Sequence, residues 1–221
     1  MAVAHTTDTL EPGTRPPAPE PIRLVQRFLN SVEIEGGDEA FDGPSGVRQW
    51  LASVGLPGSR SRLSDADVAR VVELREAIRD VLEGRTHGAP SESATRRFDR
   101  AAGRLPLRVR ATADGIGLAP SRSSGLAGAL GRILGVLAQA AADGTLDRLK
   151  VCSNDVCRWA YFDASRNRSG RWCTMAICGN RIKSRAFRGR SRGPAEADAS
   201  AGRRGGRQRR NVLPQVPSQT T

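Results

Sequence analysis

The chain has little of what an enzyme active site normally needs. It contains two histidines, His5 in the N-terminal tail and His87 between Thr86 and Gly88, and neither lies in a motif with a nucleophile or a paired carboxylate. General acid–base and nucleophilic catalysis usually enlist such groups. A phosphate-binding loop of the GxxxxGK[ST] kind is also missing. We therefore expect no catalytic residues and a protein that is not an enzyme.

Long apolar runs are lacking as well. No stretch approaches the roughly 20 apolar residues that a membrane-spanning helix needs. The N-terminus, Met-Ala-Val-Ala-His-Thr-Thr, has neither the basic start nor the apolar segment of an export signal. These absences predict a cytoplasmic protein with no membrane partner. Because the cytoplasm is reducing, they also disfavour disulfide bonds.

Acidic residues are scarce in the C-terminal third of the chain. Residues 148–190 hold 11 Lys/Arg and 2 Asp/Glu, and residues 191–221 hold 6 Arg and 2 acids. Residues 1–147 are nearly neutral, with 18 basic and 19 acidic side chains, so the net charge of +12 lies at one end. This distribution is typical of a protein that binds a polyanion through that end. A solubilising surface is the alternative, although mixed signs would suit that role better.

All four cysteines lie within 27 residues and form two pairs, Cys152/Cys157 and Cys173/Cys178. Four residues separate the partners of each pair, and fifteen separate the pairs. Two short loops that each present two sulfurs can complete the tetrahedral shell of zinc. Such a zinc ion would be structural, because four protein ligands leave no open position for a substrate water. Two disulfides or four free buried thiols are the less favoured alternatives.

Four thiolates around divalent zinc leave a net charge near minus two. Nearby cations are expected to offset that charge: Arg148, Lys150, Arg158, Arg171 and Arg181. The backbone amide of Gly179 is expected to approach a sulfur, because glycine has no side chain to obstruct it.

The string Cys178-Gly179-Asn180-Arg181, with Arg171-Trp172-Cys173 before it, resembles the CGNR-type zinc finger. That finger follows an N-terminal ABATE domain in bacterial proteins presumed to regulate transcription. The resemblance implies Cys152, Cys157, Cys173 and Cys178 as the metal ligands. The looser ABATE resemblance rests on Phe28-Leu29-Asn30-Ser31, on Trp50-Leu51 and on the segment 74–79, with Ser31 where the family usually has threonine.

The sequence therefore predicts an α+β protein that consists of four parts. Residues 1–21 are expected to be a disordered leader, 22–147 an ABATE-like domain, 148–190 the zinc finger and 191–221 a disordered basic tail. The domain is expected to be rich in helices, with one small hairpin at 105–119 that turns at Asp114-Gly115. Segments with helical periodicity lie at 22–32, 45–54, 65–82, 91–103 and 126–142.

The 65–82 helix shows the clearest pattern, with a capping box from Ser64 to Asp67 and Gly84 as its end. Its exposed side is expected to carry charges: Arg70, Glu73, Glu76, Arg79 and Asp80. Arg75 lies beside the apolar stripe, where it either extends along the core surface or holds an anionic ligand. Trp50 is expected in the core, and Asn30 either in a pocket or as a helix cap.

In the finger, residues 148–151 and 158–163 are expected to pair as strands, with Tyr161 and Phe162 in the finger's own core. Asn180 is expected to cap a helix that runs to about Arg188. Arginine can read guanine edges or neutralise phosphates. The expected DNA contacts are Arg181, Lys183, Arg185, Arg188 and Arg190 on this helix, with Arg166, Arg168 and Arg171 as phosphate clamps. For Arg181, a role beside the zinc site is an equal alternative.

Duplex DNA is therefore the favoured partner of a transcription regulator whose N-terminal domain senses a small-molecule effector or another protein. An RNA-binding protein is the first alternative, in which Trp159, Trp172, Tyr161 and Phe187 would stack on bases and the Gly202–Arg207 segment would add weak contacts. A zinc-stabilised module that docks an acidic protein is the second. The 126–142 helix could also form a homodimer interface, although a core position is favoured.

Overall fold

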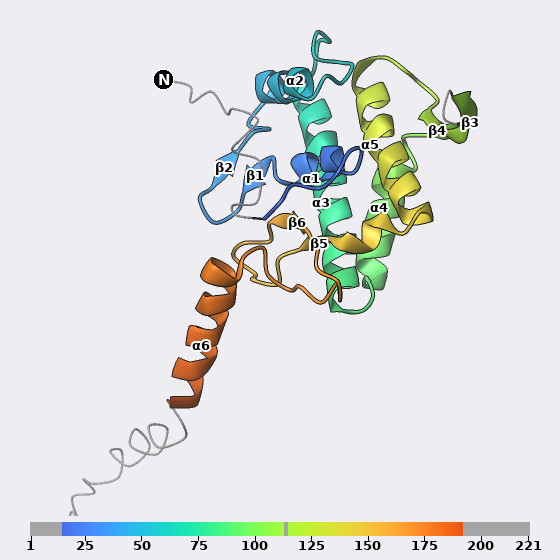
Figure 1. Ribbon diagram of the computed structural model, residues 1–221. Helices are drawn as coiled ribbons and strands as arrows, with labels where there is room; N and C mark the ends of the chain where they lie inside the picture. Colours follow the sequence, from blue (N-terminus) through green and yellow to red (C-terminus); the bar gives the residue numbers. More distant parts are fainter. Residues whose placement is uncertain (1–14, 113–114, 192–221) are drawn as a thin grey trace, which may run out of the picture. The chain divides into compact units, whose positions relative to one another are not determined.

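The chain folds as a helix-rich α+β protein (Figure 1). The computed structural model describes residues 15–112 and 115–191, so both expected tails lie largely outside the described residues. The strands form three separate two-stranded antiparallel sheets, which confirms the predicted fold class. The elements are α1 (Arg23–Leu29), β1 (Val32–Glu33), β2 (Asp38–Glu39), α2 (Pro44–Ser53), α3 (Asp65–His87), α4 (Glu92–Ala102), β3 (Leu107–Thr112), β4 (Gly115–Pro120), α5 (Gly125–Ala142), η2 (Thr145–Arg148), β5 (Leu149–Val151), β6 (Ala160–Phe162), η3 (Met175–Gly179) and α6 (Asn180–Ser191).

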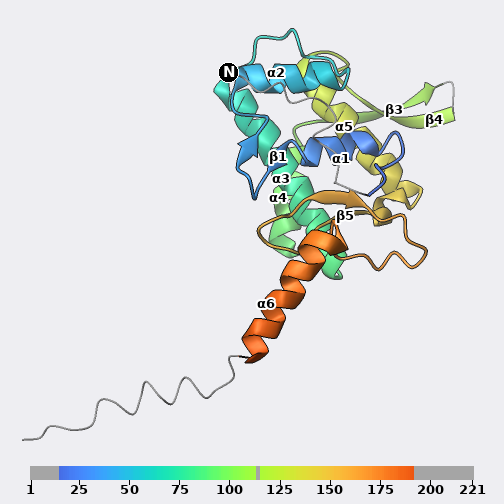
Figure 2. The same cartoon turned by 60° about the vertical axis from the view of Figure 1, so that its left-hand side comes forward.

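Helix α3 lies at the centre and packs against α1, α2, α4 and β5 (Figures 1 and 2). The predicted capping box is confirmed, because Ser64 and Asp67 exchange hydrogen bonds at the N-terminus. The predicted end was wrong: the helix continues to His87 and stops at Gly88, whose φ is 131°. Gly84 has a different role. A Cβ atom there would lie 2.4 Å from the Cα of Pro90, so glycine lets the chain return closely into α4.

One residue on the side of α3 that was expected to be exposed, Arg79, is buried. Arg79 is only 1% exposed and donates to Glu76 and to the carbonyl of Leu29 at the end of α1. Arg75 is also buried and binds both carboxylate oxygens of Glu39, at 2.6 and 2.7 Å. Neither expectation for Arg75 holds, because Glu39 and Glu76 already neutralise it. The sequence alone does not tell whether a charged side chain beside an apolar stripe is buried or exposed, because that depends on partners elsewhere in the chain.

Three aromatic rings hold the first helices together. The rings are Phe28 of α1, Phe41 between β2 and α2, and Trp50 of α2. Their ring centroids lie 5.5–5.9 Å apart, and all three are buried. Tilted and edge-to-face contacts of this kind stabilise a core beyond the area that they bury. The prediction that Trp50 belongs to the core is therefore confirmed.

Helix α5 is a core helix that supports the hairpin β3–β4. It packs against α1, β4 and η2, and it is the one described helix long and apolar enough to cross a membrane. Half of it is buried inside the protein, and Ala129 and Ile133 are fully enclosed. The expected hairpin is present, with Thr112 paired to Gly115, and Asp114 of its turn lies outside the described residues. The hairpin extends away from the helices in both views (Figures 1 and 2).

The hydrophobic core crosses the boundary between the ABATE-like domain and the finger. Leu149 and Val151 of β5, with Ala160 and Phe162 of β6, belong to the same buried cluster as Phe28 and the α3 stripe. Phe162 therefore packs on the domain and not in a separate finger core as expected. The described residues up to Asn180 form one compact unit, and the chain from Arg181 belongs to a second.

Candidate metal centre and its surroundings

The fold brings the four cysteines together. Their Sγ atoms all lie within 4.8 Å of one another, and three of the four side chains are buried. The Cys157–Cys173 and Cys173–Cys178 sulfur pairs are 3.7 and 3.6 Å apart. Sulfurs placed 2.3 Å from a tetrahedral zinc ion would be about 3.8 Å apart. The spacing therefore fits a four-cysteine zinc site.

A tight turn after β5 forms the first pair of ligands. The amides of Cys157 and Arg158 both donate to the carbonyl of Asn154, at 2.8 and 3.0 Å. Arg158 has the left-handed φ of 47°, which reverses the chain into β6. The amide of Cys152 then donates to the carbonyl of Trp159. The predicted pairing of strands across this turn is confirmed, with Lys150 opposite Tyr161.

The second pair of ligands lies on either side of a wide helical turn. Thr174 caps this turn, η3, by accepting a hydrogen bond from the amide of Ile177. The expectation that Asn180 caps α6 was wrong: its backbone is already helical, and its side chain donates back to the carbonyl of Ala176. A threonine directly before the turn was the signal in the sequence. Because Thr174 follows Cys173 directly, the cap also fixes that ligand.

Gly179 does not donate to a sulfur. Its amide donates to the carbonyl of Thr174 at 3.1 Å, which closes the turn. A Cβ atom at this position would lie 2.7 Å from the sulfur of Met175. The Met175 side chain thus packs across the turn, and it is half-exposed and flexible enough to move aside for a larger residue.

Polar atoms around the sulfurs suit thiolates. The side-chain nitrogen Nδ2 of Asn154, a fully buried residue, donates a hydrogen bond to the sulfur of Cys178 at 3.5 Å. Hydrogen bonds from Cys157 and Cys173 lower the pKa of Cys152, and the hydrogen bond to Cys152 raises that of Cys157. The cluster by itself thus favours one thiolate at the expense of its neighbours. A bound divalent cation would favour all four.

The cations that were expected to offset the thiolate charge have other partners. Arg148 donates to the carbonyls of Asp163 and Ser165, and Arg158 binds Asp80 and Glu83 of α3 at 2.8 Å. Arg15, which was not among them, lies beside the second pair of ligands instead. Its guanidinium donates to the carbonyls of Cys173 and Trp172 at 2.5 and 2.9 Å and lies over the Tyr161 ring. Residues 15–21, placed by sequence in the leader, thus belong to the folded unit.

The arginine-rich loop between the two pairs of cysteines is built around Asp163. This carboxylate is fully buried and accepts hydrogen bonds from Ser165, Gly170 and Lys150. Burial alone would raise its pKa, but hydrogen bonds from Ser165 and Lys150 hold the pKa of Asp163 well below the ordinary value. A Cβ atom at Gly170 would lie 2.8 Å from the carboxylate. The loop therefore has a defined shape that the sequence did not indicate.

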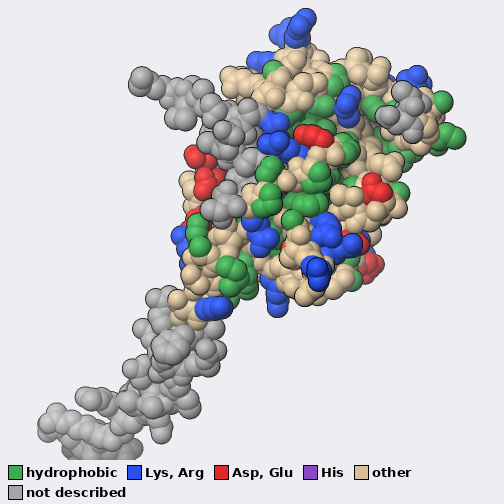
Figure 3. Space-filling model, viewed as in Figure 1, with side chains coloured by type: hydrophobic (Ala, Val, Ile, Leu, Met, Phe, Trp, Pro, Cys, Tyr) green, Lys and Arg blue, Asp and Glu red, His purple; other side chains and the backbone are tan. Residues whose placement is uncertain are grey.

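The residues predicted to bind nucleic acid lie on this loop and on α6. Arg166, Arg168 and Arg171 are exposed, although Arg168 lies 3.8 Å from Asp147 and Arg171 lies 3.5 Å from a ring nitrogen of His87. Figure 3 shows Lys and Arg side chains gathered over the finger loops on one face. On α6, Arg181, Lys183 and Arg185 are exposed. Arg188 and Arg190 lie in the same helix, but their side chains are outside the described residues.

A contact that sequence reasoning missed fastens the finger to the domain. The side chain of Asn30, at the end of α1, accepts from the amide of Ala160 at 2.8 Å and donates to its carbonyl at 2.9 Å. Both residues are buried. Asn30 is the C-cap residue of α1, as one of the two expectations had it, and its side chain also extends the edge of β6 as another backbone strand would.

Comparison with known protein families gives two matches. Residues 23–146 match the ABATE family, described as "Putative stress-induced transcription regulator", and residues 148–191 match the CGNR zinc finger. No curated protein matches the chain. The two matches confirm the resemblance and the order of the two parts. Together with the cysteine cluster they indicate structural zinc as the cofactor of the finger.

Proposed function

The chain belongs to the ABATE family, and on this basis we propose that it is a transcription regulator that binds duplex DNA through its zinc finger. The N-terminal domain would act as the sensor of a cytoplasmic regulator that is not an enzyme. Zinc would hold the finger in shape, with Cys152, Cys157, Cys173 and Cys178 as its ligands. The finger's own arginines would contact the nucleic acid.

One observation carries the proposal: the arginines of the finger divide into two sets. Those inside the fold are bound to protein groups, such as Arg148 to backbone carbonyls and Arg158 to two acids of α3. Those on the surface of the loop are exposed: Arg168 and Arg171 have only long contacts, at 3.8 Å to Asp147 and 3.5 Å to His87, and Arg166 has no described partner within residues 15–112 and 115–191. Exposed cations on a loop whose shape is held by hydrogen bonds to Asp163 are suited to phosphate contacts, which position a protein on DNA.

The start of α6 supports the same proposal. Lys183 and Arg185 are exposed, and Arg181 and Arg185 share one face of the helix at a spacing of four residues. A helix with basic side chains can enter the major groove and reach guanine edges. The loop would then hold phosphates while α6 contacts bases.

Duplex DNA is favoured over single-stranded RNA because three of the four aromatic side chains expected to stack pack against the cysteine cluster; the side chain of Phe187 lies outside the described residues. Tyr161 is fully buried beside the cysteines, and Trp159 and Trp172 pack against the same cluster. Sequence-tolerant binding of single strands relies on exposed aromatic rings. A competition between duplex DNA and single-stranded RNA at equal salt would decide between them.

The test measures affinity for duplex DNA at several salt concentrations. Replacing Arg166, Arg168 and Arg171 together by glutamine should weaken binding. It should also reduce the salt slope, the steepness with which the logarithm of the binding constant falls with the logarithm of the salt concentration, by about 2.7, or about 0.9 for each phosphate that is no longer neutralised. A matched triple replacement of Arg100, Arg104 and Arg132, all exposed on the N-terminal domain, should leave the slope unchanged. Zinc content must be equal in all three proteins. Equal slopes for both triple variants would contradict the proposed contacts.

A further inference from the structure

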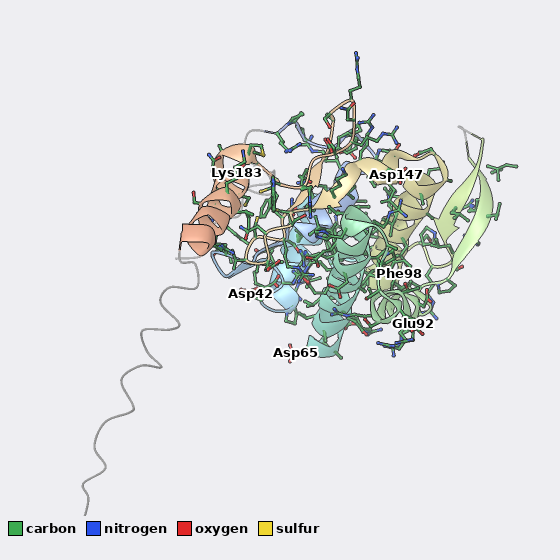
Figure 4. All side chains as sticks on the ribbon, turned by 90° about the horizontal axis from the view of Figure 1, so that it is seen from below. Asp42, Asp65, Glu92, Phe98, Asp147 and Lys183 are labelled. Atoms are coloured by element: carbon green, nitrogen blue, oxygen red, sulfur yellow. The ribbon has the colours of Figure 1, made fainter. Side chains whose placement is uncertain are left out.

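The N-terminal domain contains an apolar cavity of about 610 Å³ between α3, α4, α5 and the start of β3. Its wall includes Leu82 of α3, Phe98 of α4 and Leu134, Leu137 and Ala138 of α5. Figure 4 shows Phe98 beside α3. Sites for small molecules commonly have volumes of roughly 300–1,000 Å³, apolar walls and a few polar groups. The cavity fits that description.

One cation gives the cavity its polar end. Arg85, in the last turn of α3, lines it together with a single acid, Asp99 of α4. Asp99 is exposed to solvent, which screens its charge. The one hydrogen bond described for the Arg85 guanidinium runs from one terminal nitrogen to Asp147, at 2.5 Å. Since a guanidinium carries five N–H donors, Arg85 can hold a second carboxylate.

We propose that this cavity binds a small apolar carboxylate, with the hydrocarbon part among the leucines of α3 and α5 and the carboxylate on Arg85. The proposal rests on the proposed sensory function only in naming the ligand an effector. Carboxylate recognition favours arginine over lysine because the planar guanidinium donates two parallel hydrogen bonds. Apolar burial then provides most of the affinity.

The same arginine connects the cavity to the finger. Arg85 also lines a polar hollow formed with Asp147, Lys150 and Arg168. Asp147, placed in Figure 4 on η2 after α5, lies between Arg85 and Arg168, with 3.8 Å to the latter. Two carboxylates that share one guanidinium repel each other, so a ligand bound to Arg85 would weaken the Arg85–Asp147 ion pair and shift Asp147 toward Arg168, which is one of the proposed phosphate contacts. Ligand binding should therefore weaken the affinity for DNA.

The first measurement is calorimetry of the full chain with sodium octanoate and with octan-1-ol. One octanoate should bind per chain. Ala138→Phe, which fills the cavity from α5, should weaken octanoate binding at least tenfold, whereas Gln139→Phe, outside the cavity wall on the same helix, should not. Arg85→Met should weaken the binding of octanoate on the order of tenfold by removing a charge-assisted hydrogen bond. It should leave the affinity for octan-1-ol unchanged. Arg96 is another surface arginine with an ion pair, and Arg96→Met should change neither affinity.

Several results would overturn the proposal. These are the absence of saturable octanoate binding, binding that Ala138→Phe does not affect, or binding that Arg85→Met does not affect. A wild-type dimer that Ala138→Phe dissociates, detected by sedimentation, would show that a second copy occupies the cavity. Calorimetry needs no nucleic acid, so failure of DNA binding would leave its result standing. In the DNA assay, octanoate should weaken binding by the wild type and not by Ala138→Phe, at an ionic strength kept constant with sodium chloride.

Discussion

At the scale of single residues, Asn30 makes the most specific contact between the two parts of the chain. Replacement by alanine would leave the buried amide and carbonyl of Ala160 without their partners. Each buried unpaired group costs roughly 1–3 kcal/mol, so Asn30→Ala should reduce the free energy of unfolding by about 2–6 kcal/mol. Urea unfolding followed by circular dichroism measures this. Asn167→Ala, at an exposed loop position, should change it by less than about 0.5 kcal/mol, and equal effects would contradict the assignment.

Asp163 should determine the order of the finger loop. Asp163→Asn keeps the shape but removes the buried charge that Lys150 and Ser165 bind, and breaking a buried ion pair costs about 3–5 kcal/mol. The mutant should therefore unfold at lower urea concentration, with its largest hydrogen-exchange increase in residues 163–171. Arg166→Gln, on the same loop but exposed, is the control. Unchanged exchange in the loop would refute the role of Asp163.

The pH dependence of the same residue has a definite sign. The pKa of Asp163 in the folded protein is lower than in the unfolded chain, because hydrogen bonds and Lys150 outweigh the effect of burial. Its stabilisation is thus complete above about pH 4, the ordinary pKa of aspartate, and is lost as the pH falls toward the folded value. The difference in unfolding free energy between wild type and Asp163→Asn should shrink below about pH 4. A constant difference from pH 7 to pH 3 would contradict this.

At the scale of elements, the contact between α5 and β4 depends on glycine. A Cβ atom at Gly131 would lie 2.6 Å from Cβ of Pro120. In an ordinary helix interior, replacing glycine by alanine stabilises by about 1 kcal/mol. Here Gly131→Ala should instead destabilise by about 1–3 kcal/mol, because overpacking moves the hairpin from the helix. Combining it with Pro120→Gly, which removes the clashing atom, should recover part of the loss in thermal unfolding, and strict additivity of the two changes would argue against the clash.

The hairpin itself shows what local patterns can and cannot predict. Alternation along 105–111 and the Asp-Gly turn were sufficient to locate the strands. They did not show that one face stays open: Val109, Ile116 and Leu118 are 69%, 82% and 45% exposed, and Figure 3 shows hydrophobic side chains over β3–β4. Which face of a strand is covered depends on what packs against it, and that partner lies elsewhere in the chain.

At the scale of the whole molecule, the shared core links zinc binding to the stability of the N-terminal domain. Leu149, Val151, Ala160 and Phe162 are held by the cysteine turns and pack among the domain's helices. Structural zinc in isolated fingers contributes about 10 kcal/mol or more. If about half of this free energy stabilises the N-terminal domain, removal of zinc by a chelator should lower the melting temperature of the domain by about 10–20 °C.

The measurement is calorimetric melting with and without a zinc chelator, and the same chelator presaturated with zinc is the control. The described unit up to Asn180 should melt in one transition in both states. A domain transition that stays at its original temperature after zinc removal would show that the finger is an independent module.

Features that depend on short separations along the chain could be predicted from the amino-acid sequence. The two cysteine pairs, the capping box of α3, the helical periodicities and the arginine-rich loop all follow from residues a few positions apart, because ligand loops and helices are local structures. Three features became visible only in the folded chain: Arg79 is buried, Arg15 binds beside Cys173, and Asn30 completes the edge of β6. These contacts join residues 50, 158 and 130 positions apart, and no local pattern specifies the partner of a polar side chain over such a distance.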